Sequence, residues 1–64
     1  MAKPEHVKVG DTIFILPTAN VNARLKQRTA VVREKRGWGV WADIHMPDGD
    51  YSIRVQWDGF EVVY

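Results

Sequence analysis

Residues 46–59, which read MPDGDYSIRVQWDG, contain the stretch that decides the fold. Apolar and polar side chains alternate over residues 51–57, and an Asp-Gly pair stands on each side, at 48–49 and 58–59. An alternation with a period of two indicates a strand with one buried face, and Asp-Gly pairs are typical of tight hairpin turns. The sequence therefore predicts a strand with Tyr51, Ile53, Val55 and Trp57 facing the core and a turn at each end.

Four more short strands are predicted, at residues 12–16, 29–35, 38–45 and 60–64. The first is an apolar run ended by Pro17, the second carries the β-branched Val31 and Val32, and the last two alternate like residues 51–57. The third of these strands carries Val40, Ala42 and Ile44 inward, and the last carries Phe60, Val62 and Tyr64 on one face. Residues 18–27 are polar and predict a long loop, with one helical turn as an option over residues 21–27. Five strands joined by one long loop and three tight connections predict an all-β meander. We expect it to close into a five-stranded small barrel, because closure removes exposed sheet edges.

Length and composition limit the chain to one small domain over residues 1–64. Of its 64 residues, 45% are apolar and 27% are charged, and cysteine is absent, which excludes disulfides and thiolate metal sites. The core must be stabilised by packing, and we expect the aromatic residues, Trp57 above all, to supply much of it. No apolar stretch is long enough to cross a membrane or to act as a signal peptide, so a cytoplasmic protein without a membrane partner is expected.

The order of the predicted elements resembles the Src-homology-3-like small β-barrels, in which a long loop separates the first two strands and tight hairpins follow. The resemblance is carried by residues 9–15 (VGDTIFI), the hairpin turn at 48–49 and residues 55–59 (VQWDG). The opening Val-Gly-Asp is also similar to KOW-type barrels associated with nucleic acids, although residues 27–30 (QRTA) lack the glycine of that family. A trimethoprim-resistant dihydrofolate reductase is also such a barrel, but only Val55 and Gln56 match its Val-Gln-Ile-Tyr signature.

Charge is distributed unevenly along the chain. Residues 24–36 contain six basic residues and one acidic residue, whereas residues 37–64 contain five acidic residues and one basic residue. If the fold keeps these segments apart, the molecule has a basic and an acidic face; a meander that interleaves them gives a mixed surface.

The basic segment is followed directly by two tryptophans, and this combination predicts a nucleic-acid-binding surface. Cationic side chains neutralise phosphates and exposed indoles stack on bases. Because Val40 and Ala42 are expected to point inward, alternation directs Trp41 outward as the better stacking platform, with Trp38 as a second candidate. The predicted nucleic-acid-binding residues are Arg24, Lys26, Arg28, Arg33, Lys35, Arg36, Trp38 and Trp41.

Catalysis has little support in the sequence. The two histidines, His6 and His45, lie far apart and show no metal-ligand spacing, and the glycines form no phosphate-binding loop. We therefore expect a non-enzymatic binding module without a metal or cofactor, with nucleic acid as the leading partner and a regulatory role suggested by its size. The alternative is a protein–protein interaction module, or a small inhibitor or adaptor of a larger protein. The near-neutral net charge of +1 favours this alternative.

Overall fold

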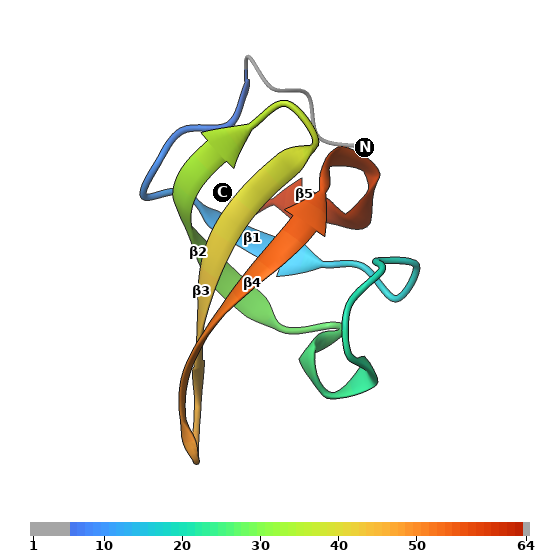
Figure 1. Cartoon of the computed structure of the whole chain (residues 1–64), viewed down its shortest axis with the longest axis vertical. Coiled ribbons are helices and arrows are strands. Elements are labelled where there is room, and N and C mark those ends of the chain that lie inside the picture. The colour runs from blue at the N-terminus through green and yellow to red at the C-terminus, as the bar shows by residue number, and fades with distance from the viewer. Residues whose placement is uncertain (1–5, 64) are drawn as a thin grey trace.

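The computed structural model describes residues 6–63, which form one antiparallel sheet (Figure 1). Its strands are β1 (Thr12–Ile15), β2 (Thr29–Arg36), β3 (Gly39–Met46), β4 (Gly49–Gln56) and β5 (Phe60–Val62). Two short 3₁₀ turns, η2 (Ala23–Leu25) and η3 (Trp57–Gly59), lie in the long loop and between β4 and β5. The predicted all-β class with five strands is confirmed. Strands β1 to β4 follow one another as a meander, whereas β5 pairs with β1, so the Asp-Gly pair at 58–59 does not form the predicted hairpin turn. No helix in residues 6–63 is long and apolar enough to cross a membrane.

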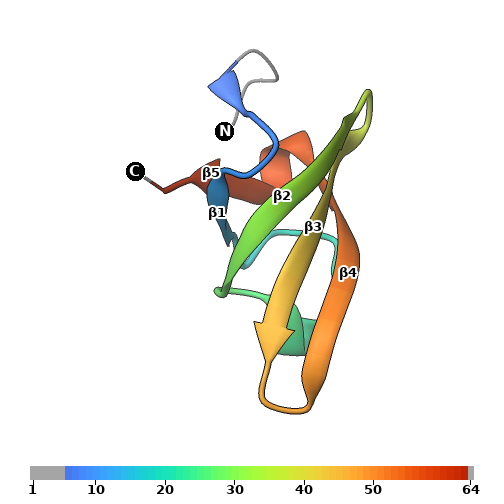
Figure 2. The same ribbon diagram turned by 90° about the vertical axis from the view of Figure 1, so that its left-hand side faces the viewer.

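The order of strands across the sheet is β4-β3-β2-β1-β5. The three long strands β2, β3 and β4 run side by side as a twisted ribbon, and β1 and β5 lie beside its upper part (Figure 2). Since β4 and β5 are the two edges, the sheet is open, and closure into a barrel stays a prediction. The register of β2 against β3 shifts between Val32 and Glu34, where a bulge increases the local twist.

The core lies on the concave side of this sheet and is mainly aliphatic. Its fully buried residues are Val7, Ile13, Ile15, Ala19, Ala30, Val32, Val40, Ala42, Ile44, Met46, Val55 and Phe60. Phe60 is the one aromatic residue in this set, and the half-buried Trp57 packs against it with ring centroids 5.9 Å apart. The expectation that aromatic residues dominate the core is therefore met by this pair alone.

One detail of the prediction needs correction, and another lies outside the described residues. Tyr51, expected in the core, is 37% exposed because it lies near the β3–β4 turn, where its hydroxyl donates a hydrogen bond to Asp48. The expected last strand includes Tyr64, which lies outside the described residues.

Candidate binding groove

An open groove of about 630 Å³ runs along the edge strand β4. The long loop between β1 and β2 forms one wall, and the outer side of β3 and β4 forms the other. The residues that line the groove are Asn20, Val21, Asn22, Leu25, Trp38, Trp41, Ser52, Ile53, Arg54 and Gln56. This set combines apolar surface, amides, a hydroxyl and one guanidinium, which is the mixture found in sites that bind and orient a ligand.

Two indoles and a guanidinium form a cluster on the sheet side of the groove. Trp41 on β3 lies directly opposite Arg54 on β4, so the two side chains project from the same face of the sheet. Trp38, in the β2–β3 turn, meets Trp41 edge-to-face with centroids 5.9 Å apart and planes at 80°. The guanidinium carbon of Arg54 lies 5.9 Å from the centroid of Trp38 and 5.8 Å from that of Trp41, within cation–π distance of both rings.

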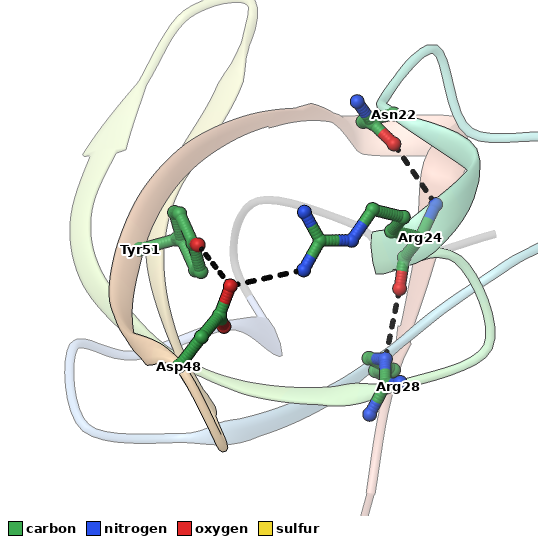
Figure 3. A network of polar contacts seen from close by, with 5 residues as sticks. All are labelled: Asn22, Arg24, Arg28, Asp48 and Tyr51. Atoms are coloured by element: carbon green, nitrogen blue, oxygen red, sulfur yellow. Dashed lines mark hydrogen bonds and ion pairs between the residues drawn. The ribbon is translucent and has the colours of Figure 1, made fainter.

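The loop side of the groove is held by a polar network (Figure 3). Asn22 caps η2 by accepting a hydrogen bond from the backbone N–H of Arg24 at 3.0 Å, and Arg28 Nε donates to the carbonyl of Arg24 at 2.8 Å. The Arg24 side chain reaches across to Asp48 in the β3–β4 turn, with 3.1 Å between Nη2 and Oδ2. The same Asp48 oxygen accepts a hydrogen bond from the Tyr51 hydroxyl at 2.8 Å. The network therefore attaches the loop to the tip of the hairpin.

These contacts change the proton affinities of the groups involved. The Tyr51 hydroxyl, and after it the Arg24 guanidinium, hold the pKa of Asp48 below its usual range. In return, the carboxylate raises the pKa of the Tyr51 phenol and that of Arg24. All three groups are exposed to solvent, so the network keeps the loop in place without forming part of the core.

The other end of the loop is attached to the far end of β4. The backbone N–H of Asn20 donates to Gln56 Oε1 at 3.3 Å. Trp57 Nε1 donates to the carbonyl of Gly37 at 2.9 Å, which fixes the turn that carries Trp38 relative to η3. The loop is thus fastened to the strand at both ends, and the groove lies between the two attachments.

The structure separates most of the predicted cationic residues from one another. Arg24 contacts the turn at the end of β3, whereas Arg36 lies opposite Gly39 at its beginning. An eight-residue strand has ends roughly 23 Å apart, so these two cations occupy opposite ends of the molecule. Lys26 lies half-buried in the long loop, and Arg33 and Lys35 lie on β2.

Acidic side chains neutralise part of the predicted basic surface. Arg24 pairs with Asp48, Arg33 Nε lies 3.6 Å from Asp43 Oδ1, and Arg36 Nη2 lies 3.0 Å from Glu34 Oε1. Two of these three pairs join the basic segment of the sequence to its acidic segment. The charged segments are therefore interleaved by the meander and do not form two separate faces.

Both predicted tryptophans line the groove, and Trp41 lies on the outward face of the sheet as the alternation predicts, although Trp38 is the more exposed of the two. Trp38 is 44% exposed, while Trp41 is half-buried beneath Trp38 and Arg54. Sequence reasoning missed Arg54, the one cation of the acidic segment. Its pairing with Trp41 depends on the register of the β3–β4 hairpin, which the alternation of the sequence does not reveal.

Comparison with models of protein families, with curated proteins and with solved structures found no match. Within residues 6–63, no group of three or more His, Cys, Asp or Glu side chains is arranged to hold a metal ion.

Proposed function

We propose that this chain is a protein-binding module that holds a short segment of its partner in the groove beside β4. The observation that supports this proposal is the cluster of Trp38, Trp41 and Arg54 at an open, partly apolar groove. Trp and Arg are the residue types that contribute most to protein interface energy when they line a pocket. The loop, fastened at both ends, gives the groove a fixed wall, which lowers the entropy lost on binding.

Nucleic-acid binding, the leading expectation from sequence, is the competing proposal. Affinity for phosphates requires several cations that are free to replace counterions. Arg24, Arg33 and Arg36 each have a carboxylate partner instead, and the net charge of the chain is only +1. The groove itself has a single cation, Arg54, beside its two indoles. This charge balance favours a protein segment over a polyanion.

The test compares both partner classes on the same protein. An array of random heptapeptides and a set of random single-stranded DNA and RNA oligonucleotides are titrated against the full chain, with tryptophan fluorescence as the readout. We expect peptides to bind, and Trp38→Ala to weaken their binding by about tenfold or more, as expected for an interface anchor. Lys8→Ala serves as the control, because it removes a cation that does not line the groove.

Two results would contradict the proposal. The first is the absence of any peptide whose binding depends on Trp38. The second is binding of oligonucleotides with a steep salt dependence and an affinity above that of every peptide, which would establish the nucleic-acid function in its place.

A further inference from the structure

The edge of β4 that faces the groove has backbone groups available for pairing. Residues 47–48 form a two-residue turn, and Met46 and Gly49 are opposite one another across it. The two residues that close a two-residue hairpin form a hydrogen-bonded pair, so alternation along the antiparallel ladder directs the N–H and C=O groups of Ser52 and Arg54 away from β3. The register thus presents these groups to the groove.

No other strand in the described part of the chain pairs with this edge. The long loop contacts β4 and its turn through side chains, Gln56 at one end and Asp48 at the other. Ser52 and Arg54 lie between those contacts, and both line the groove. A free edge strand is a template for an additional strand, so an extended segment can hydrogen-bond there.

The charge of the groove indicates which kind of side chain the bound segment carries. Arg54 is the one charged residue that lines it, and within residues 6–63 it makes no ion pair with a carboxylate. The guanidinium of Arg54 lies near two indole rings, which attract a cation. An indole offers no hydrogen-bond acceptor, so the rings do not satisfy the N–H donors of the guanidinium. An acidic side chain supplies the missing acceptor and forms a charge-assisted pair.

The apolar lining fixes what stands beside that acidic residue. Successive side chains of a strand point to opposite faces, so the neighbours of a residue opposite Arg54 point toward the inner side of the groove. Ile53 on β4 and Val21 and Leu25 on the loop line that side and pack against the core. Apolar neighbours therefore fit there.

Resting on the proposed function, we propose that the partner segment adds as a strand to the edge of β4, with an acidic residue opposite Arg54 and an apolar residue on each side of it. The backbone groups of Ser52 and Arg54 supply the main-chain hydrogen bonds. Trp38 and Trp41 cover the acidic side chain and reduce its exposure to water, which strengthens the ion pair with Arg54.

The test uses capped synthetic heptapeptides with the central sequence Val-Glu-Val, flanked by threonines, and the full chain. We expect the Glu peptide to bind with shifted amide resonances for Ser52 and Arg54, and the same peptide with Gln or Lys at the centre to bind about tenfold more weakly. N-methylation of the peptide amides that face the edge should abolish binding, because it removes the ladder hydrogen bonds. Arg54→Gln should remove the preference for Glu.

The results separate the mode of binding from the function. Failure of the Glu peptide to bind, equal binding of the Glu and Lys peptides, or unchanged binding after N-methylation would each overturn strand addition by an acidic segment. The protein-binding function would still stand if Trp38-dependent peptides emerge from the random array, and it would fall with the inference if none does.

Discussion

Gly39 is the glycine that the structure makes hardest to replace, and Gly39→Ala tests the close packing of β3 against β4. Its φ of +157° is rarely adopted by other residues, and a Cβ at this position would lie 2.0 Å from the carbonyl oxygen of Val55. The backbone conformation costs about 1–3 kcal/mol and the displacement of β4 about 1–3 kcal/mol more. Since a domain of 64 residues has a stability of roughly 3–10 kcal/mol, we expect the loss to be a large part of the total.

Two matched substitutions separate these contributions. Gly10→Ala places an alanine at a φ of +97°, where its Cβ meets no other atom, so it tests the backbone conformation alone. Gly37→Ala places an alanine where there is neither a positive φ nor a close atom. Urea unfolding followed by tryptophan fluorescence should rank Gly37→Ala near wild type, Gly10→Ala lower, and Gly39→Ala lowest. The melting temperature of Gly39→Ala should fall by more than about 10 °C. Equal stabilities for Gly39→Ala and Gly10→Ala would refute the close approach of β4.

Other perturbations test the loop network and the core. Because its pKa is lowered, the Asp48 carboxylate stabilises the fold at neutral pH, and that contribution is lost as the pH falls through its folded-state pKa. Melting temperatures between about pH 6 and pH 2 should therefore fall more in wild type than in Asp48→Asn. The Tyr51 phenol should titrate above its usual value of about 10 in an ultraviolet absorbance titration, and Asp48→Asn should lower that pKa. Trp57→Phe removes the hydrogen bond to Gly37 and should cost about 1 kcal/mol in urea unfolding, whereas an unchanged unfolding midpoint would contradict a stabilising role for this bond. Phe60→Ala, at a fully buried site, should lower the free energy of unfolding by about 3–5 kcal/mol, so the variant should lose its sheet signal in circular dichroism at 37 °C. A variant that melts cooperatively at the wild-type temperature would contradict the assigned core.

The strands could be predicted because local pattern and tertiary structure agree in them. Residues 40, 42 and 44 alternate with Trp41, Asp43 and His45 in the sequence and are all buried in β3, as expected for a sheet with one covered face. The polar stretch over residues 18–27 predicted the long loop, and η2 lies where one helical turn was an option. The predicted burial of Tyr51 was wrong because burial at a hairpin tip depends on what packs over it, and the alternation of the sequence contains no information about that.

The candidate site was harder to predict because it depends on the register of one hairpin. The Asp-Gly pair at 48–49, taken as the centre of the turn, would place Trp41 opposite Gln56. The turn is instead centred on residues 47–48, where proline takes the second position and glycine the fourth, as a type I turn prefers. Trp41 therefore lies opposite Arg54. The shift keeps every side chain on its predicted face, so the alternation of the strands does not reveal it.

The same topology explains why the charges separated along the sequence do not form separate faces. An antiparallel meander places each strand beside the next, so the basic segment on β2 lies against the acidic segment on β3, and Arg33 meets Asp43. Position in the sheet also affects which charges find a partner, since an edge strand has a neighbouring strand on one side only. Arg54 is on such an edge beside two indoles, and within residues 6–63 it forms no ion pair with a carboxylate. Recognition by this chain is therefore expected to depend on the single cation of its acidic segment more than on the six cations of its basic one.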